Sequence, residues 1–224
     1  METITTVLTP ANLRYLFSGF ATTLSVAAIS IVLSVIIGTV FGIIRNYDKF
    51  ILKKLVGFYV ELFRNTPNLL WVFICFIAAP FPTPFSRCCC AYVLFTSAMM
   101  AEIVRGGLNA IPKGQFEAAA SQGFTFIGTL WHIVIPQCFR KILPTMMSQI
   151  TTVIKDTSFL AQVAVAELLY NTKDLQSKLY VYTGHSVTFA EMCVLFGFAM
   201  LLYFIINFAL SSGAHWLQNH QQKN

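Results

Sequence analysis

Residues 111–136 read IPKGQFEAAASQGFTFIGTLWHIVIP and form a polar stretch with helix-breaking residues in an otherwise strongly apolar chain. Pro112 suits the start of a helix, residues 115–122 are good helix formers, and Gly123 stands where a helix would need a left-handed residue to end. Residues 124–131 predict a second short helix, and the closing proline predicts a bend because it lacks a backbone N–H. The stretch therefore predicts a bent pair of short helices that faces a partner.

The composition points to a membrane protein. Of the 224 residues, 56% are hydrophobic and only 11% are charged, which predicts one membrane domain over residues 1–224. The net charge is +6, and in a membrane chain its distribution matters more than its size, so nucleic acid is not expected as a partner. The six cysteines lack Cys-x-x-Cys spacing, and the sequence has no phosphate-binding loop, no helical zinc motif and no nucleophile elbow. No metal, cofactor or catalytic residue is predicted.

The apolar segments predict an all-α integral membrane protein with about five transmembrane helices. The predicted spans cover residues 16–44, 55–79, 88–108, 133–154 and 189–210. Residues 15–44 carry no charge and follow no basic cluster, so we expect them to remain as a span rather than to act as a signal peptide. Residues 157–185 are predicted to form an outer, partly re-entrant helix and loop.

The basic residues predict the orientation of these spans. Nine of the 15 Lys and Arg residues fall on segments predicted to lie inside, five fall outside, and Arg64 lies within a span. By the positive-inside rule, residues 45–54, residues 105–141 and the tail 213–224 are expected in the cytoplasm. Five spans then leave the N-terminus outside.

The second predicted span carries Glu61, Arg64 and Pro67 in its first half. Pro67 should open the helical hydrogen-bond ladder, and charges at this depth usually face a bundle interior or a water-filled path. Alternatively, Glu61 and Arg64 form a stabilising pair one turn apart. Lys155 and Asp156 are adjacent and so should point to different sides of a helix, each with its own partner.

The spacing around Gly123 resembles a known family. The run Glu117-Ala118-Ala119, three residues, Gly123, nine residues and Ile-Val-Ile-Pro at 133–136 is similar to the Glu-Ala-Ala loop of permeases in ATP-binding-cassette (ABC) importers. The chain departs from it with Ile135 in place of Leu, and with Gln122 where polar-amino-acid permeases commonly carry Leu. Neither change removes the pair of helices.

The resemblance implies a type I ABC importer transmembrane domain in which residues 111–136 are a cytoplasmic coupling loop that docks in a cleft of the ATPase. Small alanines would let the helix approach a groove, and one glutamate would orient the contact. The blander alternative is an Ala-rich turn that only packs on its own bundle. The coupling residues that the resemblance implies are Gly114, Glu117, Ala118, Ala119, Gly123, Ile133 and Pro136.

Further segments resemble the polar-amino-acid branch of these permeases, and together the matches cover about residues 64–167. They are residues 64–67, 101–107, 111–115, 135–137 and 155–158. The branch implies that the chain carries a polar amino acid such as glutamine, glutamate or a basic amino acid. Arg64, Glu102, Lys155 and Asp156 are candidates for the substrate path, because a zwitterion needs partners of both signs.

The resemblance also implies the partners: a cytoplasmic ATPase dimer that binds the ATP, a second permease half that is identical or related, and an extracytoplasmic amino-acid-binding protein. The expected location is the bacterial cytoplasmic membrane. One alternative is an ion-coupled secondary transporter or channel, which would use the same charges but leaves the coupling loop unexplained and lacks a detectable inverted repeat. Another is a purely structural membrane subunit.

Overall fold

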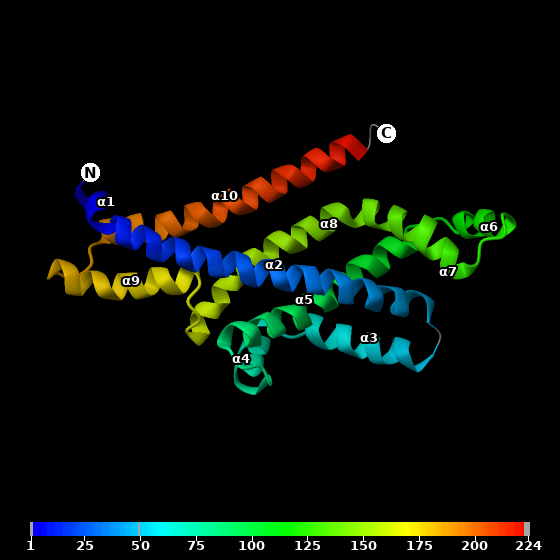
Figure 1. Ribbon diagram of the computed structural model, residues 1–224, viewed down its shortest axis with the longest axis horizontal. Coiled ribbons are helices and arrows are strands. Elements are labelled where there is room, and N and C mark those ends of the chain that lie inside the picture. Colours follow the sequence, from blue (N-terminus) through cyan, green and yellow to red (C-terminus); the bar gives the residue numbers. More distant parts are fainter. Residues whose placement is uncertain (1, 49, 222–224) are drawn as a thin grey trace. The chain divides into compact units, whose positions relative to one another are not determined.

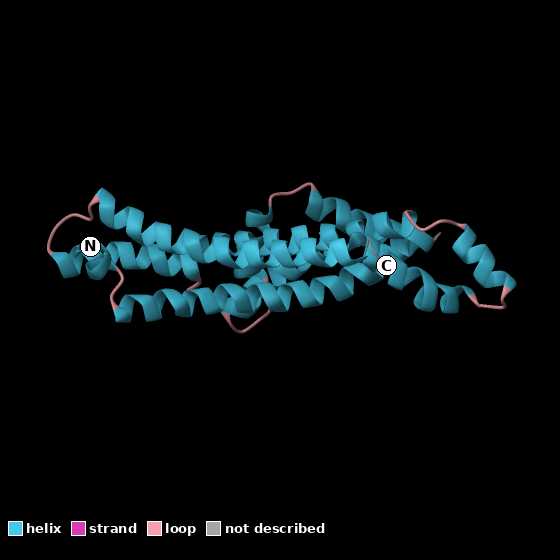
Figure 2. Cartoon of the chain, turned by 90° about the horizontal axis from the view of Figure 1, so that it is seen from above, coloured by secondary structure: helices cyan, strands magenta, loops and turns pink. Residues whose placement is uncertain are grey.

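The computed structural model describes residues 2–48 and 50–221, and every regular element within them is helical (Figure 1 and Figure 2). The helices are α1 (Glu2–Val7), α2 (Pro10–Tyr47), α3 (Ile51–Arg64), α4 (Asn68–Ala78), α5 (Pro84–Asn109), α6 (Gly114–Ser121), α7 (Phe126–Thr129), the π-helix η1 (Leu130–Val134), α8 (Ile135–Asp156), the 3-10 helix η2 (Thr157–Val163), α9 (Leu168–Thr183) and α10 (Phe189–Gln221). Lys49 and residues 222–224, on which part of the predicted charge asymmetry and tail depends, lie outside the described residues.

Three of the described helices are long and apolar enough to cross a membrane, namely α2, α5 and the segment Phe189–Ala214 of α10. They contain the first, third and fifth predicted spans. The fourth predicted span corresponds to α8, which begins two residues later than expected. The predicted outer segment 157–185 consists of η2 and α9.

The second predicted span is interrupted at Pro67, as its missing backbone N–H predicted. Helix α3 has 14 residues and α4 has 11, so at about 1.5 Å per residue each is shorter than the roughly 30 Å of a bilayer core. At the end of α3, the Asn65 side-chain amide donates to the Glu61 carbonyl at 2.8 Å, and the Thr66 hydroxyl donates to the Leu62 carbonyl at 2.7 Å. Two carbonyls near the break therefore accept side-chain hydrogen bonds.

The chain forms two compact units, each described by itself. Unit 1 comprises Met1–Ser30, Leu69–Tyr92 and Thr151–Leu210, and unit 2 comprises Ile31–Asn68, Val93–Ile150 and Ser211–Asn224. The core of unit 1 joins α1, α2, α9 and α10. Its buried members are Val7, Leu16, Leu168, Leu175, Leu179, Leu195, Ala199 and Leu202.

The core of unit 2 joins α5 and α8 to the ends of the coupling loop. Its buried members are Met100, Val104, Leu108, Ile111, Leu130, Val134, Ile135, Cys138, Ile142 and Met146. Side chains from the second half of α2, including Val35 and Ile43, pack against this core. Because Ile111 and Leu130 belong to the loop, both of its ends are fixed to the two helices that it connects.

Candidate functional site

The first helix of the coupling loop ends as the sequence predicted. Gly123 is left-handed, with φ at +82°, and follows directly after the last turn of α6. The Phe124 amide donates to the Ala119 carbonyl at 3.0 Å, and the Gly123 amide donates to the Ala120 carbonyl at 3.0 Å. This pair of bonds is a Schellman motif, which satisfies two carbonyls at the end of the helix.

The second helix is shorter than expected and continues into a π-helix. Thr125 caps α7 by accepting a hydrogen bond from the Gly128 amide, and η1 then precedes Pro136 in the first turn of α8. A proline ring clashes with the carbonyl four residues before it, and a wider π-turn relieves such a clash. The strain at Pro136 is therefore met by local widening within a continuous run of helix.

Polar contacts hold the loop to the helices that flank it. The Gln137 side-chain amide on α8 donates to the Gln115 side chain on α6 at 3.1 Å. The Lys141 ammonium donates to the Ala110 carbonyl, which follows α5, at 2.8 Å. In Figure 1, α6 and α7 lie beside each other beyond these ends of α5 and α8. A force on the loop therefore acts on both helices.

Aromatic rings also fix the loop to the end of α2. The Tyr47 ring meets the Phe116 ring at 5.9 Å and the Phe126 ring at 5.2 Å between centroids, both edge to face. The Phe116 and Phe126 rings stack on each other at 5.9 Å. Such aromatic pairs each contribute about 0.5–1.5 kcal/mol beyond the area that they bury. The three rings hold α6 and α7 together as one element.

The outer surface of the loop carries exposed apolar side chains that sequence reasoning missed. Phe124, Ile127 and Trp131 are all exposed, with Ile127 at 67%. Phe124 lies just before the cap residue Thr125, Ile127 lies in α7 and Trp131 lies in η1. Three large apolar residues in a short and otherwise polar loop were the available clue. An unpaired apolar surface of this kind is typical of an interface with another protein.

The predicted coupling residues do not all face outward. Gly114, Glu117, Ala118, Gly123 and Pro136 are exposed, and Ile133 is half-buried. Ala119 is only 3% exposed, so its side chain packs against its own chain. Ala118 and Ala120 are thus the alanines that a partner can reach.

Three helices bring charges together around Glu102 of α5 in unit 2. Its carboxylate pairs with Arg45 at the end of α2 and with Arg105 one turn further along α5, whose Nε donates to it at 2.7 Å. Arg64 on α3 lies 3.6 Å from the same carboxylate. Glu61, also on α3, lies 3.7 Å from Arg45. We call these five residues the Glu102 cluster.

The cluster rules out the alternative in which Glu61 pairs with Arg64. Each of them pairs instead with a residue of another helix, because α2 and α5 offer opposite charges at the level of α3. Of the predicted path residues, Arg64 and Glu102 are therefore brought together. Lys155 and Asp156 lie in unit 1.

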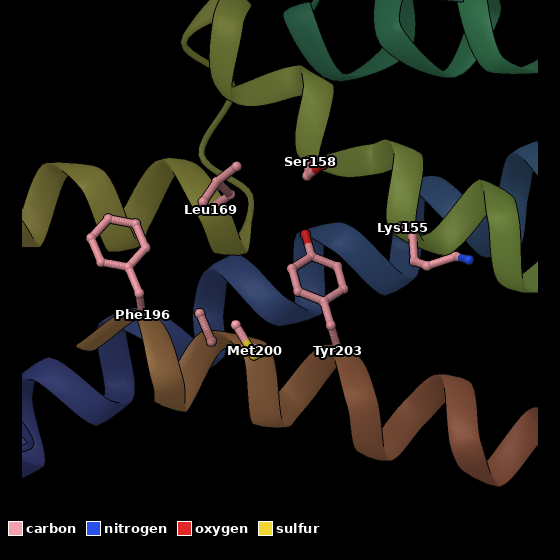
Figure 3. Close-up of a pocket in the computed structure, with 7 residues that line it drawn as sticks. Lys155, Ser158, Leu169, Phe196, Met200 and Tyr203 are labelled. Atoms are coloured by element: carbon pink, nitrogen blue, oxygen red, sulfur yellow. The ribbon is translucent and has the colours of Figure 1, made fainter. Parts of the chain in front are cut away.

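Lys155 lines a cavity of about 320 Å³ in unit 1 (Figure 3). The other lining residues are Ser158, Leu169, Phe196, Ala199, Met200 and Tyr203. Asp156 accepts a hydrogen bond from the Tyr92 hydroxyl through its backbone carbonyl. Within residues 2–48 and 50–221, no hydrogen bond or ion pair involves the Lys155 side chain.

Glu167 is a fully buried carboxylate that contacts Tyr203, one of the residues that line this cavity. It caps α9 by accepting hydrogen bonds from the Leu169 amide at 2.9 Å and the Tyr170 amide at 2.6 Å. The Tyr203 hydroxyl donates to it at 3.0 Å and the Thr23 hydroxyl at 3.4 Å. Burial raises the pKa of Glu167, while these four donors favour its charged form. The carboxylate has its hydrogen-bond partners and orients Tyr203.

Comparisons with known proteins identify the family of the chain. A family model described as "Binding-protein-dependent transport system inner membrane component" matches residues 34–223. The probable glutamine ABC transporter permease protein GlnP of Bacillus subtilis (strain 168) is 37% identical over 214 residues, which cover 94% of this chain and 95% of that protein. The probable glutamine ABC transporter permease protein GlnM of the same strain is 29% identical, with 95% and 96% covered.

Solved structures show the same fold. An amino acid ABC transporter crystallised with histidines superposes with a TM-score of 0.79 at 23% identity, covering 93% of this chain and 94% of that one. The inward-facing MetNI methionine ABC transporter superposes with a TM-score of 0.73 at 16% identity, covering 94% and 99%. The fold is that of a type I ABC importer transmembrane domain. Because the family model matches most of the sequence, this chain belongs to the family of binding-protein-dependent transport system inner membrane components.

Proposed function

We propose that the chain is a permease half of an ATP-driven importer for a polar amino acid and that it has no ATPase site of its own. With a second permease half it forms the translocation path, and an extracytoplasmic amino-acid-binding protein delivers the solute. The protein lies in the bacterial cytoplasmic membrane, with its N-terminus outside and its C-terminus in the cytoplasm. Two of its Bacillus subtilis relatives are named probable glutamine permeases and a third is named an L-cystine permease, which supports an amino acid as the solute.

The observation that carries the proposal is the coupling loop, residues 111–136. Its exposed residues Phe124, Ile127 and Trp131 offer an apolar surface, and its ends are fixed to α5 and α8 through the core of unit 2. An amphipathic helix that lays its apolar face into a groove is a common mode of protein recognition. Closure of a pair of ATPase subunits would move the loop, and with it the ends of α5 and α8, so that access to the path alternates.

Co-purification of the ATPase subunit with the permease tests whether the coupling loop is the binding site for the ATPase. The permease is co-expressed with its candidate ATPase and purified in mild detergent, and the eluate is assayed for ATP hydrolysis. We expect Glu117→Arg combined with Gly123→Pro to reduce recovery of the ATPase at least tenfold. The proline cannot adopt the positive φ of Gly123, and the arginine reverses the charge on the exposed face of α6.

Gly184→Pro is the matched control, because Gly184 is the other described glycine with a positive φ and ends α9 in unit 1. This variant should recover as much ATPase as the wild type does. Equal recovery by the loop variant would contradict the assignment of the dock. Solute transport by the permease alone, with no ATPase bound, would favour the secondary-transporter alternative instead.

A further inference from the structure

A second cavity lies in unit 2, next to the coupling loop. Its volume is about 380 Å³, which falls within the roughly 300–1,000 Å³ of ligand pockets. Its wall is formed by residues at the ends of α2 and α5 and by residues of both short helices of the loop. A molecule held in this cavity therefore contacts the loop together with α2 and α5.

Two opposite charges line one side of this cavity. Lys113 directly precedes α6, and Glu117 lies four residues later within α6, so the two side chains occupy the same side of the helix. Opposite charges at this spacing commonly pair. Among the described residues, however, no ion pair or hydrogen bond involves either side chain. The cavity therefore offers one cation and one anion to a bound molecule.

The rest of the lining suits a polar side chain on a short aliphatic stem. Asn46 and Asn109 contribute side-chain amides, each of which can both donate and accept hydrogen bonds. The rings of Tyr47, Phe116 and Phe126, which contact one another, form an apolar part of the wall. Such a lining matches a small zwitterion with a hydrogen-bonding side chain, which is the chemistry of the proposed solute.

We propose that this cavity binds the imported amino acid from the cytoplasmic side and thereby slows further uptake. Lys113 binds the α-carboxylate, Glu117 binds the α-ammonium group, and the amides of Asn46 and Asn109 bind the polar side chain. Because Lys113 and Glu117 are exposed, solvent screens their charges, and the site binds weakly. It therefore fills only when solute has accumulated inside. This inference rests on the proposed function, which places the loop in the cytoplasm.

Inhibition follows from the elements that the bound molecule joins. Closure of the ATPase subunits would move α6 and α7 with the ends of α5 and α8, whereas Tyr47, which contacts both short helices, belongs to α2. A ligand that binds one of two arrangements shifts the equilibrium toward that arrangement. A molecule that bridges α2, α5 and the loop therefore holds the loop in place and opposes the movement that couples ATP hydrolysis to transport.

Uptake by proteoliposomes loaded with unlabelled L-glutamine tests this inference. The vesicles contain the permease, its ATPase subunit and lumenal ATP, which energises only transporters whose loop faces the lumen. The binding protein and radiolabelled L-glutamine are added outside. We expect lumenal L-glutamine to lower the initial rate of uptake at least threefold relative to unloaded vesicles. Lumenal L-glutaminamide, which lacks the α-carboxylate, and glutaramate, which lacks the α-ammonium group, should leave the rate almost unchanged.

Substitutions in the cavity separate this site from the translocation path. Lys113→Gln should abolish the inhibition, so that its rates in loaded and unloaded vesicles are equal, and Lys113→Arg should retain most of it. Asn109→Ala lies outside the loop and should weaken the inhibition, which keeps the inference testable if Lys113→Gln loses transport. Lys54→Gln is the matched control and should stay inhibited, because Lys54 is an exposed lysine of unit 2 that does not line the cavity.

Two kinds of failure can be told apart. Equal inhibition of the wild type, Lys113→Gln and Asn109→Ala would overturn this inference alone, since the solute would then act on the translocation path. Equal inhibition by L-glutamine and its two analogues would also overturn it, because the paired charges would have no role. Absence of ATP-driven uptake into unloaded vesicles would overturn the proposed function, and this inference with it.

Discussion

Glu102→Gln should lower the free energy of unfolding by about 3 kcal/mol. The substitution removes the carboxylate with which three arginines pair, namely Arg45, Arg64 and Arg105. Breaking a buried ion pair costs roughly 3–5 kcal/mol, because the remaining charge loses its partner. We expect a loss at the lower end of this range because Arg64 and Arg105 are partly exposed, and solvent therefore screens their charges. Unfolding of the detergent-solubilised protein by heat or denaturant measures the loss.

Glu61→Gln provides the matched control within the same cluster. The Glu61 side chain is 68% exposed and forms a single contact of 3.7 Å with Arg45, whereas the Glu102 side chain is 18% exposed. Exposed pairs contribute about 0–1 kcal/mol, so the control should unfold almost as the wild type does. Equal losses of unfolding free energy in the two variants would contradict the assignment of Glu102 as the residue on which the stability of the cluster depends.

Gly38→Ala should destabilise the protein by about 3 kcal/mol. A Cβ at Gly38 on α2 would lie 2.5 Å from the Met100 Cβ and 3.0 Å from both the Ala101 nitrogen and the Ser97 carbonyl oxygen on α5. None of these atoms can rotate away, so the two helices must separate. Overpacking of this kind costs roughly 1–3 kcal/mol, and small residues at membrane helix contacts permit the close approach. Thermal unfolding in detergent measures the effect.

Gly57→Ala should change the stability of the protein in the opposite direction. Gly57 lies within α3, and a Cβ there would meet nothing within 4 Å. Alanine is better than glycine in a helix by about 0.5–1 kcal/mol, so this variant should be slightly more stable than the wild type. No loss of stability in Gly38→Ala would contradict the packing of α2 against α5, and a loss in Gly57→Ala would contradict the open space beside Gly57 on α3.

Local features of the fold could be predicted because each depends on one residue and its neighbours. Gly123 ends a helix with positive φ because other residues pay a steric cost there, and Pro67 interrupts a span because it lacks an N–H. The first membrane span could be predicted from the length of the uncharged run in α2 alone. These predictions are confirmed at the residues named.

Pairings between distant segments could not be predicted. Glu61 and Arg64 have the right spacing for a pair, yet the fold brings Arg45 and Glu102 to them from two other helices. The π-turn before Pro136 was expected only as a bend, because the sequence does not say how a helix absorbs the clash. Likewise, the burial of Ala119 and the lack of a side-chain partner for Lys155 among the described residues depend on how helices rotate about their axes.

We propose that ATP drives solute through this chain by way of its coupling loop. The most direct test is uptake of radiolabelled L-glutamine by proteoliposomes that contain the permease, its ATPase subunit and its binding protein. We predict uptake that requires ATP and falls at least tenfold with Ile127→Asp, which places a charge on the exposed face of the loop, but not with Val181→Asp at an exposed site on α9. Uptake that proceeds without ATP, is driven by an ion gradient and is unaffected by Ile127→Asp would contradict the account.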